Sequence, residues 1–323
     1  MSADAIWKDA VAEAICGNEV TSRAGNTYES LAFQSSGNPL KPFLFDKTRT
    51  ASPIYASAEL LWYMNGSDSG DMICHYAPSY NRFLNEGKAM GAYGARIFAT
   101  LAYEDIAKEL FRGQSRRAVV PIFGLSDLRN TRDESCKDIP CSLSLQFMNR
   151  DGELHMITTM RSNDVWLGLP YDSFCFMMIQ LMMCELTGLS PGVYFHQAGS
   201  LHLYERNLDL IDSGMPGGDD PQMYPSQEGE ELELVLNYER PTLSILPGIR
   251  STEITTRSGS FTGEESRFAN TWGDFSIPTT LLTLASCQNY SKMSNEDIVR
   301  LSRFVDPRLI KRASEIVNSR ASK

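Results

Sequence analysis

The strongest constraint on the fold is a helix-length apolar run at 174–189, FCFMMIQLMMCELTGL, in which nearly every residue is hydrophobic. A helix that is apolar on all sides must be buried, either in a protein core or in a membrane. Gln180 and Glu185 interrupt the run, which is also shorter than the roughly 20 residues needed to span a bilayer. We therefore expect a buried helix that ends near Gly188, inside a fold large enough to enclose it.

Composition allows such a core and limits the function. The chain has 323 residues, 42% of them hydrophobic, enough for one large domain or two modest ones. Its net charge is −10, and no basic tract could follow a nucleic-acid backbone. The seven cysteines lack CxxC spacing and a nearby His pair, which argues against a disulfide framework or a zinc site. The N-terminus lacks a signal pattern, so we expect a cytoplasmic protein. Together with the charge, the cysteine spacing and the short apolar run, this predicts a protein that uses no metal and binds neither membrane nor nucleic acid.

Local patterns predict a mixture of helices and strands without internal repeats or a low-complexity linker, which favours one α/β domain built on a large mixed sheet. Helices are expected at 3–16, from Pro53 to Gly66 and in about the last 30 residues, where Ser294 and Asp306 would be N-caps and Pro307 the first helical residue. Strands are expected at 116–123, 153–162, 193–207 and 232–246, a polar loop at 124–138 and a long surface loop at 213–231.

Two residues have uncertain environments on local pattern alone. Cys141, in PCSLSLQF at 140–147, is by residue type more often a packed small side chain than a nucleophile. A reactive thiolate needs positive charge nearby, and an arginine cluster could both supply it and bind a phosphate dianion. Glu59 lies on or beside the apolar face of the helix at 53–66, where spacing alone favours a side chain that reaches solvent. The candidate arginines are Arg23, Arg116, Arg117 and Arg161.

Several short motifs in a fixed order carry a family resemblance. They are TSRAGNT, AELLWYMNG, YGAR, SRR, PCSLSLQF, MRSNDVWLGLPYD and GSLHLYERN. Over roughly residues 20–245 the chain thereby resembles the thymidylate synthase family. The resemblance implies an α/β fold of the α+β type, with a large bent mixed sheet that is flanked by helices and forms the interface of a homodimer. It implies a catalytic domain at 1–245 and a divergent, largely helical extension at 246–323 packed on the same domain.

The resemblance also implies a role for each matching residue. Cys141 would attack C6 of a pyrimidine nucleotide, and C5 would then take the methylene of the co-substrate 5,10-methylenetetrahydrofolate. Glu59 would organise water for proton transfers, which gives it a reason to be buried, and Tyr93 would assist removal of the C5 proton. Asp164 would be a further catalytic residue that lies against both the base and the folate, and Glu59 and Gly168 would also contact the folate. Nucleotide contacts would come from Arg23, Gln146, Arg161, Ser162, Asp172, His202, Tyr204 and, from the partner subunit, Arg116 and Arg117.

Asp172 is the most informative departure from the family pattern, which has Asn at this position. A carboxylate only accepts hydrogen bonds, so it suits the 4-amino group of cytosine, and a protonated carboxyl can also donate to N3. The same change marks the deoxycytidylate hydroxymethylase branch of the family. A plain helix N-cap is the competing interpretation of Asp172.

Ser142 replaces a His beside the nucleophile, which fits a changed base but does not identify it. A further departure concerns the product: the segment 75–94 has no Trp, and the C-terminal tail is unlike that of the family. A less sealed site favours addition of water over hydride transfer. We therefore expect a dCMP 5-hydroxymethylase. The alternatives are a CMP 5-hydroxymethylase of a nucleoside-antibiotic pathway, a dCMP C5-methyltransferase and a silent nucleotide- or mRNA-binding regulator.

Overall fold

The central feature of the computed structural model is a mixed sheet with the strand order β1-β2-β6-β5-β4-β3. The structure describes residues 1–22, 24–46, 48–49, 51–100, 102–133, 136, 138–212, 281, 284–302, 305 and 307–321. Within these residues, β5 and β6 are parallel and the other neighbouring strands are antiparallel. The strands are β1 (Asn18–Ser22), β2 (Gly25–Gly37), β3 (Val119–Pro121), β4 (Ser142–Arg150), β5 (Glu153–Asp164) and β6 (Ser190–Tyr204).

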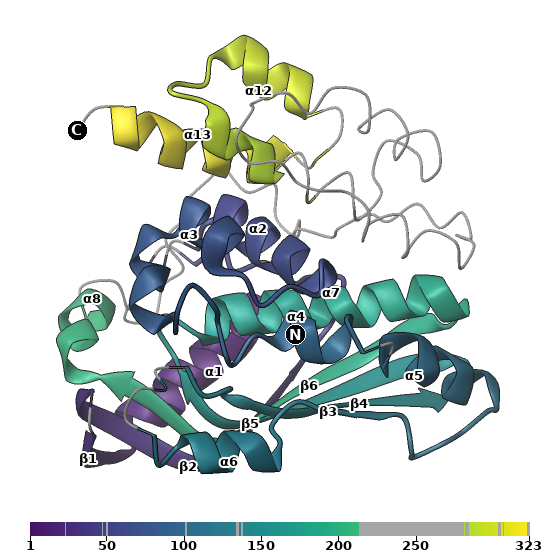
Figure 1. Ribbon diagram of the computed structural model, residues 1–323. Helices are drawn as coiled ribbons and strands as arrows, with labels where there is room; N and C mark the ends of the chain where they lie inside the picture. The colour runs from purple at the N-terminus through teal and green to yellow at the C-terminus, as the bar shows by residue number, and fades with distance from the viewer. Residues whose placement is uncertain are drawn as a thin grey trace.

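The predicted buried helix is confirmed as α7 (Leu169–Thr187), which lies across one face of the sheet (Figure 1). It begins at Leu169, earlier than the apolar run suggested, with Pro170 in its first turn. It ends at Gly188, whose φ of 71° is left-handed backbone that glycine adopts without strain. Because α7 connects β5 to β6, it is the crossover that lets these two strands run parallel.

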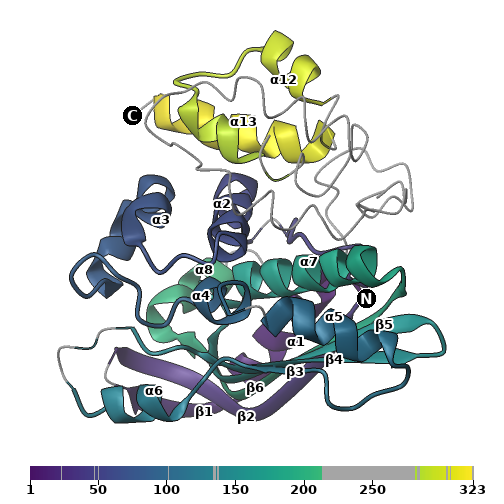
Figure 2. The same cartoon turned by 45° about the vertical axis from the view of Figure 1, so that its right-hand side comes forward.

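Other helices cover the same face of the sheet as α7 (Figure 2). The predicted N-terminal helix is confirmed as α1 (Ala3–Ile15), and α5 (Ala102–Phe111) packs on β3 and β4. The predicted helix at 53–66 is confirmed as α2 (Pro53–Met64), capped by Ser52 and ending at Asn65. α2 packs against α7, so these two helices bring the residues of the candidate site together.

The local patterns missed several short elements. The predicted loop at 124–138 contains a helix, α6 (Leu125–Asn130), and β3 is only a part of the strand predicted at 116–123. The β1–β2 hairpin was not predicted, because β1 is mostly exposed and neither strand has a clear alternation of apolar and polar residues. The remaining short elements are α3 (Gly70–Tyr76), η1 (Pro78–Phe83), α4 (Tyr93–Ile97), η2 (Glu205–Asn207) and α8 (Leu208–Asp212).

The C-terminal helices were predicted correctly where the structure describes them. α12 (Asn295–Leu301) is capped by Ser294, α13 (Pro307–Ala321) begins at Pro307, and η3 (Cys287–Asn289) precedes both. α13 packs on α2 (Figure 1). Leu309 lines a small apolar cavity together with Phe174 of α7. The predicted cap Asp306, the strand at 232–246, the loop at 213–231 and the boundary at 245/246 lie outside the described residues. No described helix is long and apolar enough to cross a membrane.

Candidate active site

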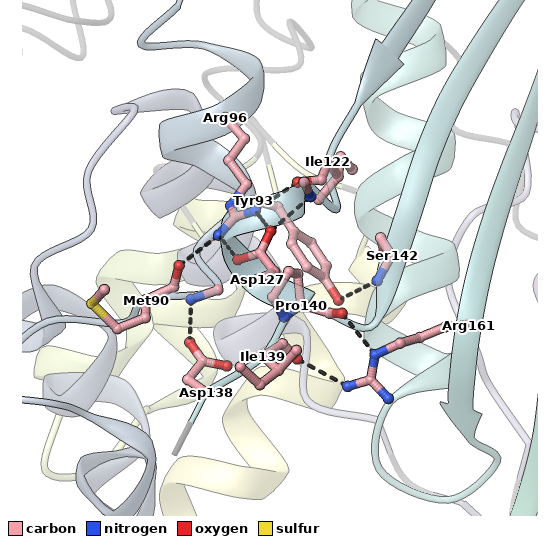
Figure 3. Close-up of polar contacts among 12 residues, drawn as sticks. Met90, Tyr93, Arg96, Ile122, Asp127, Asp138, Ile139, Pro140, Ser142 and Arg161 are labelled. Atoms are coloured by element: carbon pink, nitrogen blue, oxygen red, sulfur yellow. Dashed lines mark hydrogen bonds and ion pairs between the residues drawn. The ribbon is translucent and has the colours of Figure 1, made fainter. Parts of the chain in front are cut away.

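Cys141 is half-buried and immediately precedes β4. Arg161 contacts the segment that carries it (Figure 3). Arg161 Nε donates to the carbonyl oxygen of Pro140 at 3.0 Å, and Nη2 donates to that of Ile139 at 3.1 Å. The backbone amide of Arg161 donates to the carbonyl oxygen of Cys141, and Nη2 lies 3.7 Å from Cys141 Sγ. The structure therefore brings together the predicted nucleophile and one of the predicted arginines.

The electrostatic surroundings keep Cys141 protonated. Burial raises the pKa of its thiol, Arg161 lowers it, and the carboxyl groups of Asp172, Asp138 and Asp164 raise it again. The net shift is upward, so one arginine does not outweigh burial and three acidic groups.

Tyr93, at the start of α4, is in direct contact with the Cys141 segment. Its hydroxyl oxygen accepts the backbone N–H of Ser142 at 3.3 Å, and its ring stacks on Phe176 of α7 with centroids 5.9 Å apart. Burial raises the pKa of Tyr93 well above its usual range, and the ionised forms of Asp172 and Cys141 would add to this shift. Tyr93 is thus held as a neutral hydroxyl beside the predicted nucleophile.

An ion pair between Arg96 of α4 and Asp127, which the sequence did not predict, fixes α4 (Figure 3). Arg96 donates two hydrogen bonds to Asp127 of α6, at 2.6 and 2.8 Å, and two more to the carbonyl oxygens of Ile122 and Met90. Asp127 is 2% exposed, so this is a buried bidentate pair. Because its members are 31 residues apart in the chain, no local pattern connects them.

Glu59 is buried, and the expectation from spacing that it reaches solvent is wrong. The hydroxyl of Tyr55 donates to Glu59 Oε1 at 3.0 Å, and Cys175 Sγ lies 3.8 Å from Oε2. Burial raises the pKa of Glu59 to about 7, although hydrogen bonds from Tyr55, Cys175 and Tyr63 oppose the shift. A carboxyl with such a pKa can both hold and release a proton near neutral pH. Tyr55 and Glu59 are four residues apart on one helix, so the sequence could have predicted this contact.

This shift predicts a pH-dependent stability. Folded Glu59 keeps its proton up to about pH 7, whereas the unfolded chain releases it near pH 4.5. The contribution of Glu59 to the free energy of unfolding is therefore full below pH 4.5 and is lost as the pH rises through 7. Glu59→Gln removes this fall. Urea unfolding at pH 5 and pH 8 should show that wild type loses about 2 to 3 kcal/mol more than the variant between the two. Parallel changes in the two proteins would contradict a buried, protonated Glu59.

Asp172 is not the N-cap of α7, because Gly168 occupies that position and Asp172 follows in the first turn. The competing interpretation of Asp172 as a plain helix cap is therefore wrong. Its Oδ2 accepts a hydrogen bond from Asn163 Nδ2 at 2.8 Å. Burial raises the pKa of Asp172 well above its usual range, Glu59 and Asp164 raise it further, and the hydrogen bond from Asn163 only partly opposes them. Desolvation thus favours the protonated, neutral form of this carboxyl.

The remaining residues around the loop between β5 and α7 form a second group beside Arg161. Ser162 Oγ lies 3.5 Å from His202 Nδ1, and the His202 ring packs edge-on against Tyr204 at 5.3 Å. Asp164 Oδ1 accepts the backbone N–H groups of Trp166 and Leu167, which fixes the carboxylate at the start of the loop.

Three other predicted residues are not brought to Cys141 in this chain. Gln146 Nε2 donates to the carbonyl oxygen of Arg116 at 3.1 Å. Five residues of extended strand separate Gln146 from Cys141, a span of about 16 Å. Arg116 and Arg117 are exposed at that distant end of β4, and Arg23 lies outside the described residues. In the part of the chain that the structure describes, no group of three or more His, Cys, Asp or Glu side chains could hold a metal ion.

Comparison with known proteins identifies similar sequences. The model of the family described as thymidylate synthase matches residues 17–216. A thymidylate synthase of Symbiobacterium thermophilum is 29% identical over 175 residues, which cover 48% of this chain and 60% of the relative. A deoxyuridylate hydroxymethyltransferase of Bacillus phage SP01 is 29% identical over 186 residues, which cover 52% of this chain and 47% of the relative. The chain thus spans about half to three fifths of the length of these relatives.

Proposed function

The chain belongs to the thymidylate synthase family, and from this premise we propose that it transfers a one-carbon unit to C5 of a cytosine nucleotide. The reaction converts dCMP, 5,10-methylenetetrahydrofolate and water into 5-hydroxymethyl-dCMP and tetrahydrofolate. The observation that carries the proposal is the position of Asp172, a buried carboxyl that lies near enough for its ionised form to act on both Cys141 and Tyr93 and that is itself affected by Glu59. The residue that would contact the base therefore lies close to both the proposed nucleophile and the proposed proton-transfer residue.

Covalent addition is the first step of the proposed reaction. Cys141 Sγ forms a bond to C6 of the pyrimidine, and the electron pair of the C5–C6 double bond moves to C5. The thiol proton passes to water as Sγ attacks, because Cys141 is protonated in the resting chain. Arg161 Nη2, 3.7 Å from Sγ, stabilises the charge that develops on sulfur.

The later steps conserve electrons and need no oxidant. C5 bonds to the methylene carbon, and the C5 proton passes to water beside the Tyr93 hydroxyl. The bond from the methylene carbon to the folate nitrogen breaks, its electron pair stays on that nitrogen, and the nitrogen takes a proton from water to give tetrahydrofolate. Water then adds to the exocyclic methylene, and Cys141 leaves C6. Glu59, with a pKa of about 7, exchanges protons with water during these steps.

Asp172 is the residue from which we infer that the nucleobase is cytosine. Cytosine presents an acceptor at N3 and a donor at its 4-amino group, and a neutral carboxyl offers the complementary donor and acceptor. An Asn at this position would instead suit uracil, which presents a donor at N3 and an acceptor at O4. The similarity to a phage hydroxymethyltransferase supports the hydroxymethyl product, whereas Asp172 favours cytosine over the deoxyuridylate named for that relative.

The nucleotide phosphate and sugar are assigned to the group beside Cys141. Arg161 and Ser162 would bind the phosphate, and His202 and Tyr204 the 3′-hydroxyl of the sugar. Arg116 and Arg117 of the partner subunit would complete the phosphate site, since these residues lie far from Cys141 of their own chain. This part of the proposal requires a homodimer.

The sheet face opposite α7 supports a dimer. Register pairs place Phe195, Ile157, Gln146 and Val119 in one row across that face. None of the four is buried, and the Val119 side chain is exposed. A row of incompletely covered side chains, two of them large and apolar, fits a surface that a second subunit covers.

The folate is assigned to the rim of the site. The fixed carboxylate of Asp164 complements the paired N–H donors of a pterin ring. Bound there, the co-substrate supplies the methylene carbon to C5. The segment 75–94 offers Tyr76, Tyr80 and Phe83 but no Trp, and we infer that water reaches the exocyclic methylene more readily than in a synthase.

Mass spectrometry of the products tests the proposal. The protein is incubated with methylenetetrahydrofolate and dCMP, CMP or dUMP, and absorbance near 340 nm is followed for dihydrofolate. We expect a hydroxymethyl group on dCMP and no dihydrofolate. A methylated product with dihydrofolate, or product from dUMP alone, would overturn the assignment of product or base, and absence of any product would favour a nucleotide-binding regulator.

A further inference from the structure

A chain of buried hydrogen bonds lies directly behind Asp172. Asn163 Nδ2 is 2.8 Å from Asp172 Oδ2, and Asn163 Oδ1 is 2.8 Å from His196 Nε2. His196 Nδ1 in turn is 2.8 Å from the hydroxyl of Tyr194. His196 and Tyr194 are 0% exposed and Asn163 is 2% exposed, so water does not satisfy these groups. The chain joins β6, β5 and α7. Asn163 lies within the motif MRSNDVWLGLPYD but was given no role there, and His196 and Tyr194 belong to none of the motifs that indicated a function.

The orientation of the Asn163 amide gives the chain its direction. Asn163 presents its amide nitrogen to Asp172, so its oxygen faces His196 and must accept a hydrogen bond there. His196 therefore carries its proton on Nε2. Burial lowers the pKa of His196 to about 4, so the ring is neutral and Nδ1 accepts from the Tyr194 hydroxyl. Every donor in the chain thus points toward Asp172.

The consequence for Asp172 is that its two oxygens are not equivalent. Oδ2 already accepts a hydrogen bond from Asn163, so the proton of the neutral carboxyl belongs on Oδ1. A carboxyl without such a partner could carry its proton on either oxygen. It could then match cytosine with one proton position and uracil with the other.

We infer that Asn163, His196 and Tyr194 are positioning residues that fix the hydrogen-bonding roles of the two Asp172 oxygens, with Oδ2 as an acceptor and Oδ1 as the donor. Asp172 then matches only one of the two bases. The inference rests on the proposed function, under which Oδ2 faces the 4-amino group of cytosine and Oδ1 faces N3. Uracil would place its O4 against the fixed acceptor and its N3–H against the donor.

Gly168 supplies an independent observation on the same contact. A Cβ at this position would lie 3.0 Å from Asn163 Nδ2 and 3.0 Å from Asp172 Oδ2. The φ of Gly168 is −77°, so an alanine is conformationally allowed and its only conflict is space. The glycine of the Leu-Gly-Leu-Pro segment thereby leaves room for the hydrogen bond between Asn163 and Asp172. Gly168→Ala perturbs this bond without removing a polar group.

The first test compares base discrimination in matched variants. For each protein, kcat/KM is measured with dCMP and with dUMP. We expect Asn163→Leu to lower the ratio of the two values roughly ten- to a hundredfold, and Gly168→Ala to lower it less, because a fixed hydrogen bond to the carboxyl is lost or stretched. The control is Gln180→Met, which removes another buried amide bond, from Gln180 Nε2 to the Leu154 carbonyl, elsewhere on α7. This control should keep the wild-type ratio.

The result that overturns the inference is a wild-type ratio in both Asn163→Leu and Gly168→Ala, with only equal losses of activity on the two nucleotides. If Asn163→Leu does not fold, Gly168→Ala alone decides the outcome. His196→Gln should rescue the contact, since its amide can accept from Tyr194 and donate to Asn163, so this variant should keep most of the discrimination.

A second measurement separates this inference from the proposed function. Two-bond ¹H–¹⁵N correlation spectra of histidine-labelled protein report which ring nitrogen of His196 carries the proton, and they need no substrate. We expect Nε2–H from pH 6 to 8. Protonation at Nδ1 would refute the direction of the chain even if dCMP is the substrate. A chain with the expected direction in a protein that modifies no cytosine nucleotide would place the failure in the proposed function.

Discussion

Replacing Cys141 by serine is expected to abolish turnover, by roughly 10⁴-fold or more, while the fold and nucleotide binding persist. The thiol provides the atom that bonds to C6, and a serine hydroxyl has no base positioned to activate it among the contacts at this site. The change replaces sulfur by oxygen in a half-buried position, so Arg161 keeps its hydrogen bonds to the carbonyl oxygens of Ile139 and Pro140. Product formation by mass spectrometry and dCMP binding by calorimetry measure the two properties separately.

Cys74→Ser provides the matched control, because this thiol is also half-buried but lies on α3 and has no role in the proposed reaction. It should retain wild-type turnover. Persistence of turnover in Cys141→Ser would exclude the covalent mechanism. A wild-type protein that binds dCMP without converting it, and a variant that binds equally well, would instead indicate a regulator.

Replacing Asp172 by asparagine is expected to swing the preference from cytosine toward uracil nucleotides. The ratio of kcat/KM for dCMP to that for dUMP should fall roughly ten- to a hundredfold, because an amide matches O4 and N3–H of uracil where the carboxyl matches cytosine. Burial favours this exchange, since the buried site disfavours an ionised carboxyl and accommodates a neutral amide. Asp151→Asn, on the exposed turn between β4 and β5, is the control for an acidic-to-amide change away from the site.

The same variant also probes the hydrogen bonds behind residue 172. To present its nitrogen to uracil O4, the new amide must also donate to Asn163, which then reverses its own amide and accepts. His196 should consequently carry its proton on Nδ1 in Asp172→Asn and on Nε2 in wild type. An unchanged preference for cytosine would remove the main support for the proposed substrate.

Sequence patterns were reliable where one element determines its own environment. The apolar run before Gly188 fixed a buried helix, and Ser294 and Pro307 marked the starts of the two C-terminal helices, because caps and apolar faces act within a few residues. The ordered motifs around Cys141 likewise identified the family, and the family match supports this identification. The exposed β1–β2 hairpin and the short α6 carry weak local signals and were missed.

The sequence by itself determined the buried helix, the family and the identity of the candidate nucleophile, since these depend on local periodicity and on motifs in a fixed order. Only the tertiary structure decided the environments of Glu59 and Asp172. Spacing favoured an exposed Glu59, and the contact of α2 with α7 buries it beside Cys175. Asp172 was compatible with a helix cap until Gly168 proved to hold that position. The pKa of a carboxyl depends on desolvation and on charges from distant segments, and these exist only after the strands and helices have packed.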